Sequence, residues 1–211
     1  MSQSRLNPAL TDTLRRLRVV PVLTIDRVEI AVPLARALVA GGLTALEVTL
    51  RTDAALAAIR QIAEGVPDAL VGAGTILSPD DGQRALEAGA RFLVSPGLSP
   101  QLVGAAEQWR VPFLPGAATA SEVMALRDLG YRCLKFFPAE ASGGVATLKG
   151  LGAPLPDIAF CPTGGIGPAT MADYLAEPNV VAVGGSWVAP PKALSDGDWE
   201  QITSLARAVF A

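Results

Sequence analysis

Eight short apolar runs, each of strand length, recur along this 211-residue chain at intervals of about 21 to 27 residues. They begin at Val19, Leu46, Leu70, Arg91, Pro112, Cys133, Ala159 and Val180. Amphipathic helical patterns fill most of the intervals, for example over residues 28–40, 54–63 and 79–88. Glycines stand where helix C-caps are expected, at Gly41, Gly42, Gly65, Gly89 and Gly130. Eight strand–helix units in about 190 residues predict a closed, parallel (β/α)8 barrel of the TIM type.

The segments outside this repeat suit a single domain. Residues 1–18 are expected to form a leading helix and residues 198–210 a closing helix, and no linker divides residues 1–211. A doubly wound open sheet is the structural alternative. That fold normally carries a glycine-rich fingerprint after its first strand, whereas here Thr24, Ile25 and Asp26 follow the strand.

Charge and composition limit the partners. The 17 basic and 20 acidic residues nearly balance and no basic run exceeds a pair, so a nucleic-acid footprint is not expected. No apolar stretch approaches the ~20 residues of a membrane span, and no apolar region follows the polar residues 1–5. Cys133 and Cys161 sit in strand-like runs and are expected to be small, reduced core residues, which favours the cytoplasm.

The sequence contains no histidine, which limits its chemistry. Histidine is the commonest metal ligand and the commonest general base at neutral pH. Catalysis must therefore rely on lysine, arginine, carboxylates, tyrosine, cysteine or hydroxyl groups.

Polar side chains interrupt the second strand. Because side chains alternate along a strand, Glu47, Thr49 and Arg51 are expected to point into the barrel, opposite an apolar face. Buried parallel strands normally read as continuous apolar runs. Charged groups near the carboxyl end of such a strand lie where barrel enzymes build their active sites.

The sixth strand repeats this anomaly at Lys135, which shares a face with Cys133 and Phe137. Lysine is almost never fully buried without a partner or a function. Burial and a neighbouring cation, for which Arg51 is the candidate, would favour the uncharged amine, and an uncharged amine can attack a ketone. A structural ion pair of Glu47 with Lys135, or of Glu47 with Arg51, is the alternative.

Two glycine pairs end the last two strands. They are Gly164-Gly165 and Gly184-Gly185, and Ser186 follows the second pair. Glycine lets backbone N–H groups approach an anion, and barrels often hold phosphate after strands seven and eight, so a phosphate site is predicted here. Ordinary turn chemistry is the alternative. Thr75, after the third strand, is either a ligand contact or the cap of the next helix.

Taken together, these segments resemble the 2-keto-3-deoxy-6-phosphogluconate (KDPG) aldolases, class I enzymes that often also cleave 4-hydroxy-2-oxoglutarate (KHG). The matching segments are VVPVL, AGGLTALEVTLRT, VGAGTIL, SPGLSP, LKFFPAE, FCPTGGI and VGGSWV, in family order from about Val19 to Pro190. The fifth strand, LPGAAT, departs mildly from the family pattern because relatives often carry a bulkier residue after its glycine.

The resemblance implies a role for each candidate residue. Lys135 matches the family's Schiff-base lysine and Glu47 its proton-shuttling glutamate. Further matches concern substrate binding: Arg51 and Thr75 for the carboxylate, Phe137 for the aldehyde portion, and Gly164, Gly165 and Ser186 for the phosphate. The implied activity is cleavage of KDPG to pyruvate and glyceraldehyde 3-phosphate, and possible cleavage of KHG to pyruvate and glyoxylate.

The same resemblance implies no metal or other cofactor, because the protonated imine replaces a Lewis acid, and it implies a homotrimer. The expected partners are pyruvate and a small phosphorylated 2-keto acid. Three alternatives remain open: an isomerase or epimerase with a phosphate-binding barrel, an aldolase for the galactonate epimer, and a non-catalytic phospho-sugar-binding module.

Overall fold

All paired strands in the structure, a computed structural model that describes residues 8–211, run parallel. The strands are β1 (Val19–Leu23), β2 (Ala45–Thr49), β3 (Leu70–Gly74), β4 (Leu93–Val94), β5 (Phe113–Leu114), β6 (Gly116–Ala117), β7 (Cys133–Phe136), β8 (Ala159–Pro162) and β9 (Val183–Gly185). They form a six-stranded sheet in the order β5-β4-β3-β2-β1-β9 and a three-stranded sheet in the order β6-β7-β8. Single bridges at Phe160–Val180 and Thr163–Gly184 connect the region of β8 with that of β9. The result is a curled parallel α/β arrangement.

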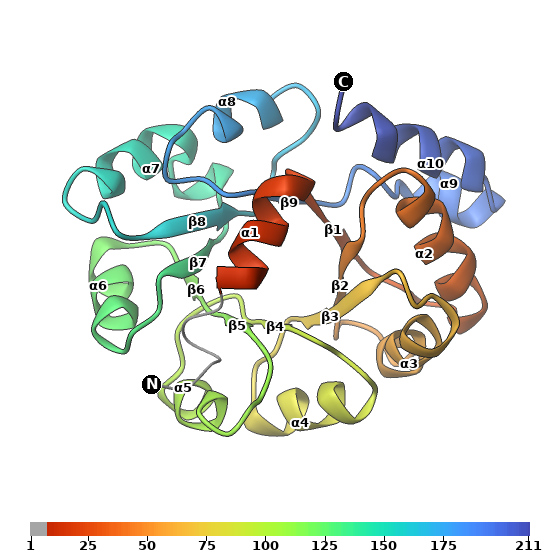
Figure 1. The fold of residues 1–211 in the computed structure, drawn as a ribbon, viewed down its shortest axis with the longest axis horizontal. Helices are drawn as coiled ribbons and strands as arrows, with labels where there is room; N and C mark the ends of the chain where they lie inside the picture. The colour runs from red at the N-terminus through yellow and green to blue at the C-terminus, as the bar shows by residue number, and fades with distance from the viewer. Residues whose placement is uncertain (1–7) are drawn as a thin grey trace.

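Helices surround the strands (Figure 1). They are α1 (Pro8–Leu17), α2 (Ala31–Ala40), α3 (Ala55–Gly65), α4 (Pro79–Glu87), α5 (Pro100–Ala106), α6 (Ala120–Asp128), α7 (Gly144–Gly152), α8 (Met171–Leu175), α9 (Pro191–Asp196) and α10 (Trp199–Ala208), with short 3-10 turns η1 (Val28–Ile30) and η2 (Glu140–Ser142). None of the helices among the described residues combines the length and apolar character that crossing a bilayer requires.

The predicted strand positions are confirmed, with one difference. A strand lies in or beside each of the eight predicted runs, but the fifth run is divided into β5 and β6 by Pro115. Proline has no N–H to donate to a ladder. Its carbonyl instead accepts a hydrogen bond from the Lys135 N–H at 2.9 Å, which joins this segment to β7.

The predicted helices differ mainly at their ends. α1 occupies the place of the predicted leading helix, of which residues 1–7 lie outside the described residues, and α10 occupies the place of the closing helix. The predicted C-cap at Gly65 is wrong, because Gly65 is the last residue of α3 and Val66 takes the cap position. Gly42 and Gly89 follow their helices with φ of 98° and 99°, a conformation that favours glycine.

Two apolar layers explain why the active groups lie at one end of the strands. Leu46 and Val48 of β2 pack in the outer layer, between strands and helices. Ala45, on the opposite face, belongs to an inner cluster, to which α1 contributes Leu10, Leu14 and Leu17. The other inner residues are mostly at strand beginnings, and Figure 1 shows α1 lying across the ring of strands. α1 therefore covers the amino ends of the strands and leaves the carboxyl ends free for a binding site.

Candidate active site

Lys135 and Glu47 form a buried pair on the inward faces of β7 and β2. The Lys135 Nζ donates to the Glu47 Oε1 at 3.1 Å, and the two residues are 6% and 3% exposed. Period-two alternation places both side chains inward, as the sequence predicts. The contact joins residues 88 apart in sequence, so folding brings the two strongest catalytic candidates into direct contact.

A glycine on β3 makes room for the carboxylate. Gly74 pairs with Thr49 of β2, and a Cβ at Gly74 would overlap the Glu47 Oε1. Glycine therefore lets the carboxylate lie against the backbone of the neighbouring strand. We expect Gly74→Ala to displace Glu47.

The predicted phosphate-binding glycines line a separate cavity of about 260 Å³ at the carboxyl ends of β1, β8 and β9. The predicted site residues on its wall are Arg51, Phe137, Gly164, Gly165, Gly184, Gly185 and Ser186. Gly164 and Gly165 have φ of 106° and 83°, which allows the loop after β8 to turn its backbone toward the cavity.

Phe137 connects this cavity with the Lys135–Glu47 pair. Its ring lines the cavity, and the Lys135 Nζ lies 5.2 Å from the ring centroid. A ligand in the cavity can therefore place a carbonyl group near the amine while its other end occupies the glycine-lined wall.

Arg51 lies just beyond the carboxyl end of β2. β2 ends at Thr49, so strand alternation no longer fixes the direction of the Arg51 side chain, which is exposed and lines the cavity. Among the described residues, the charged group in contact with the Lys135 amine is Glu47. That Arg51 is a cation near Lys135 stays a prediction; Arg51 and Phe137 line the same cavity, and the Lys135 Nζ lies 5.2 Å from the Phe137 ring centroid.

Thr75 has a backbone conformation that its sequence pattern does not reveal. Its φ is 61°, an unusual value for a β-branched residue and one that costs about 1–3 kcal/mol. The residue does not line the glycine-walled cavity. The alternative that Thr75 caps the next helix is wrong, because the Ser78 side chain accepts from the Asp81 N–H and caps α4. Strain of this kind is typical of functional sites.

Four cavity residues were not predicted as site residues. They are Val22, Thr24, Thr163 and Ile166. Thr24 could have been found from its position, since it is the first polar residue after the apolar run of β1. Thr163 directly precedes the predicted glycine pair and is buried.

Both cysteines are free, and one of them lies beside the site. Cys161 pairs in register with Lys135. Burial is the main cause that raises the pKa of the Cys161 thiol, and the Glu47 charge raises it further. Burial also raises the pKa of the Cys133 thiol to about 11. Both residues therefore remain thiols at neutral pH, which supports the prediction of reduced core cysteines.

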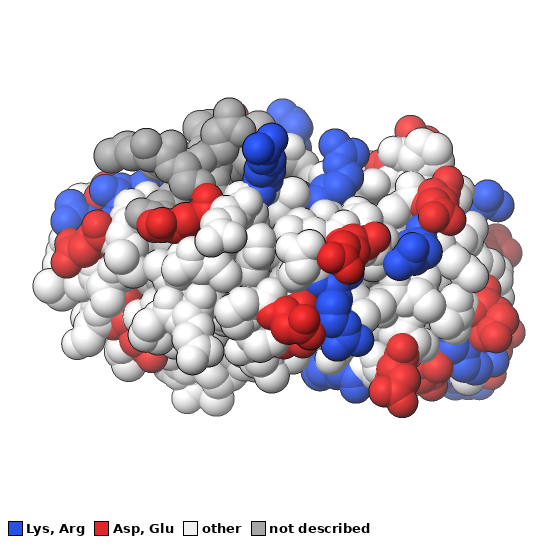
Figure 2. Space-filling view, turned by 90° about the horizontal axis from the view of Figure 1, so that it is seen from below, with Lys and Arg blue, Asp and Glu red and all other residues white. Residues whose placement is uncertain are grey.

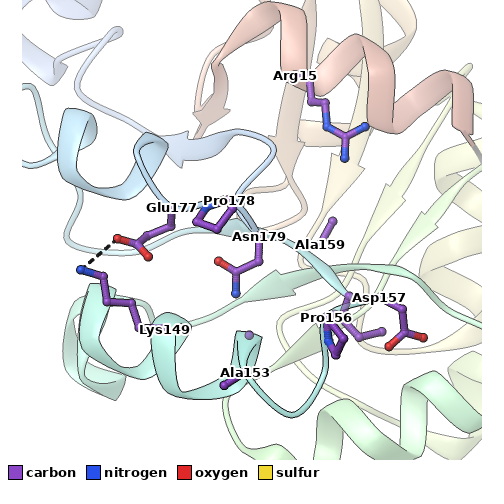
Figure 3. A pocket seen from close by; sticks show the side chains of 11 residues that line it. Arg15, Lys149, Ala153, Pro156, Asp157, Ala159, Glu177, Pro178 and Asn179 are labelled. Atoms are coloured by element: carbon purple, nitrogen blue, oxygen red, sulfur yellow. Dashed lines mark ion pairs between the residues drawn. The ribbon is translucent and has the colours of Figure 1, made fainter.

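A larger cavity, of about 460 Å³, lies elsewhere and holds none of the predicted site residues (Figure 3). Its wall includes Lys149 and Glu177, whose side chains form an ion pair at 3.2 Å. Arg15 of α1 projects toward this cavity. Because α1 covers the amino ends of the strands, the cavity lies near those ends. This pair provides a natural control for the pair in the active site.

The charged surface agrees with the near-even composition. In Figure 2, lysine and arginine lie next to aspartate and glutamate, mainly on the right half of the face, and no area of one charge sign dominates. Within residues 8–211, no group of three or more cysteine, aspartate or glutamate side chains could hold a metal ion.

The parallel strands and helices, with a buried lysine–carboxylate pair beside a glycine-walled cavity at the carboxyl ends of the strands, indicate an α/β enzyme. The sequence profile of the KDPG and KHG aldolases matches residues 10–205. The chain belongs to the KDPG and KHG aldolase family.

Curated relatives and solved structures agree with this assignment. The KHG/KDPG aldolase of Escherichia coli K12 is 52% identical over 189 residues, which are 90% of this chain and 89% of that protein. The 2-dehydro-3-deoxy-phosphogluconate aldolase of Pseudomonas aeruginosa is 52% identical over 200 residues, 94% of this chain and 91% of that protein.

Two solved structures are similar over nearly the whole chain. The Legionella pneumophila KDPG aldolase, with pyruvate captured at low pH as a covalent carbinolamine intermediate, has 43% identity and a TM-score of 0.91, covering 94% of this chain and 97% of that one. The Zymomonas mobilis ZM4 enzyme with 3-phosphoglycerate has 46% identity and a TM-score of 0.89, with 95% of each chain covered.

Proposed function

We propose that this protein is a class I aldolase that cleaves KDPG to pyruvate and glyceraldehyde 3-phosphate, and that it also cleaves KHG to pyruvate and glyoxylate. The observation that carries the proposal is the buried contact between Lys135 and Glu47, at 3.1 Å. The names of the relatives support the substrate, and the carbinolamine captured in the Legionella enzyme supports covalent chemistry with pyruvate.

The first steps use the proton that Lys135 and Glu47 share. Transfer of that proton from Nζ to the Glu47 Oε1 gives the neutral amine, which attacks the C2 ketone to form a carbinolamine. Glu47 returns a proton to the departing hydroxyl, so water leaves and a protonated imine remains. The contact with Glu47 therefore gives the lysine a proton acceptor that can activate it.

Bond cleavage then uses the imine as an electron sink. Glu47, again a carboxylate, takes the proton of the C4 hydroxyl, the C3–C4 electrons move into the iminium, and glyceraldehyde 3-phosphate leaves. Glu47 returns the proton to C3 of the enamine, and water hydrolyses the resulting pyruvate imine to free Lys135.

The remaining predicted residues hold the substrate. Arg51 and Thr75 are assigned to the carboxylate, Phe137 to the aldehyde portion, and Gly164, Gly165 and Ser186 to the phosphate. A shared cavity wall supports all of these assignments except that of Thr75, which rests on the family resemblance and on its unusual φ. The 3-phosphoglycerate in the Zymomonas structure supports recognition of a phosphorylated three-carbon end.

The larger architecture is part of the same proposal. Bridges between the regions of β8 and β9, and the continuity of β5 and β6 through Pro115, support closure of the two sheets into one (β/α)8 barrel domain over residues 1–211. A homotrimer follows from the family resemblance alone. The two free thiols are compatible with a cytoplasmic location.

The isomerase or epimerase alternative is not favoured. Such enzymes take their acid and base from carboxylates, cysteine or histidine and do not require a buried lysine. The galactonate epimer differs only in stereochemistry, and separate assays of the two epimers decide between them.

Reduction with borohydride in the presence of pyruvate tests the proposed intermediate. We expect a covalent adduct on the peptide that contains Lys135, because the imine is reduced to a stable secondary amine. Mass spectrometry of the digested protein measures it, and the exposed Lys149 and Lys192 serve as internal controls. An unmodified Lys135 peptide after complete exposure would reject the lysine as nucleophile.

A carboxylate placed in the glycine-lined cavity tests the phosphate assignment. We expect Ser186→Asp to raise KM for KDPG by about 10- to 100-fold, because two negative charges then face each other at short range. KHG has no phosphate, so KM for KHG should change much less. Ser121→Asp, at an exposed position in the first turn of α6, is the matched control. An unchanged KM for KDPG would move the phosphate elsewhere.

A further inference from the structure

Two threonine hydroxyls form a short chain that ends at the cavity. The Thr49 Oγ1 donates to the Leu23 carbonyl oxygen at 3.0 Å, and the Thr24 Oγ1 lies 3.2 Å from the Thr49 Oγ1. Thr49 is buried at the end of β2, whereas Thr24 follows β1 and is exposed on the cavity wall. The chain therefore runs from the backbone of β1 through β2 to the cavity.

The direction of these hydrogen bonds follows from proton counting. A hydroxyl carries one proton and two acceptor lone pairs. Because the Leu23 carbonyl can only accept, the Thr49 proton is committed to it. The proton between the two threonines then comes from Thr24. Thr24 thus faces the cavity with acceptor lone pairs and no free proton.

The position of Thr24 lies between the two anion-holding ends of the cavity. In the sheet, β1 has β2 on one side and β9 on the other. Arg51 follows β2 and Ser186 follows β9, and both line the same cavity as Thr24. The central atoms of a ligand that extends from Arg51 to Ser186 therefore lie next to Thr24.

We propose that Thr24 accepts a hydrogen bond from the C5 hydroxyl of KDPG and so selects aldehydes that carry a hydroxyl beside the carbonyl. This inference rests on the proposed function. The substrate carboxylate has no proton to donate, and the phosphate, with its second pKa near 6, has mostly lost its own at neutral pH. The C4 hydroxyl gives its proton to Glu47. The C5 hydroxyl is the donor that remains.

The reverse reaction makes this selection measurable. In the condensation of pyruvate with an aldehyde, C5 of KDPG comes from C2 of glyceraldehyde 3-phosphate. The matched substrate without this hydroxyl is 3-oxopropyl phosphate. A site that hydrogen-bonds a substrate hydroxyl discriminates against an analogue that lacks it.

The test combines two variants with two aldehydes. Thr24→Val keeps the volume and removes the hydroxyl, and Thr24→Ser keeps the hydroxyl. We expect Thr24→Val to lower kcat/KM for glyceraldehyde 3-phosphate by about three- to tenfold, the usual scale for one neutral hydrogen bond, and to change that for 3-oxopropyl phosphate much less. Thr24→Ser should restore the preference of the wild-type protein. The measurement is the consumption of pyruvate.

Each outcome decides the inference. A selective loss with valine that serine restores supports it. An equal loss for both aldehydes, or none for either, overturns it while leaving the lyase assignment standing, since the wild-type protein still condenses the aldehydes. If the wild-type protein condenses neither aldehyde with pyruvate, the proposed function itself fails and the inference fails with it.

Discussion

Lys135→Met is expected to lower the turnover of KDPG by about four to six powers of ten, the scale seen when a covalent nucleophile is removed. Methionine has a similar length and fits an apolar site, but it cannot form an imine. The loss should appear in kcat, measured by coupled detection of pyruvate. Borohydride trapping with pyruvate should disappear in the same variant.

Stability must be separated from chemistry in this experiment. Lys135→Met leaves the Glu47 carboxylate buried without its cation, and breaking a buried pair costs about 3–5 kcal/mol. The double variant Lys135→Met/Glu47→Gln removes both charges and should regain much of the free energy of unfolding without regaining turnover. If the double variant is folded and retains turnover within tenfold of wild type, Lys135 is not the nucleophile.

The second lysine–glutamate pair supplies the matched control. Lys149 lies 3.2 Å from Glu177, but its side chain is mostly exposed and lines the cavity in Figure 3. The Glu177 side chain is only 11% exposed, but the exposed Lys149 leaves this pair more open to water than the pair in the active site. Lys149→Met should therefore leave turnover unchanged and lower the free energy of unfolding less than Lys135→Met does.

The sequence predicts the inward side chains well where strands are regular. Period-two alternation places Glu47 and Lys135 inward, and the structure confirms both positions. The alternation could not predict the distance between the two side chains, because β2 and β7 are not neighbouring strands. That distance depends on how the two parallel sheets curl toward each other.

Prediction fails where the backbone leaves the regular strand. Arg51 lies two residues beyond the end of β2, where strand alternation no longer fixes the direction of its side chain, and it lines the cavity. Thr75 has a left-handed φ of 61°, so alternation along β3 cannot tell which way it points. Pro115 divides a strand that its apolar neighbours predict to be continuous.

Hydrogen-bond direction is also hidden in the sequence. Thr24 and Thr49 are 25 residues apart, and only the sheet register brings their hydroxyls together. A polar residue at the end of a predicted barrel strand is nonetheless a recognisable feature, because barrel enzymes build their sites there. By this criterion Thr24 could have been named a site candidate before any coordinates were known.

Glu47→Gln is expected to lower the turnover of KDPG by about two to four powers of ten, the usual contribution of a general acid or base. Glutamine keeps the size of the side chain that packs beside Gly74 and can still accept a hydrogen bond from Lys135. It cannot take the proton of the lysine or of the C4 hydroxyl. The loss should therefore lie mainly in kcat, with a modest change in the affinity for substrate.

Glu177→Gln is the matched control, since it neutralises the carboxylate of the other lysine–glutamate pair, at 3.2 Å, outside the site. Borohydride trapping adds a second measurement, because imine formation with pyruvate also passes protons through Glu47 and should slow in Glu47→Gln. Turnover within threefold of wild type, with trapping at the normal rate, would mean that another group moves the protons. The Lys135–Glu47 contact would then be a structural ion pair. Neutralising one partner separates this alternative from a catalytic role.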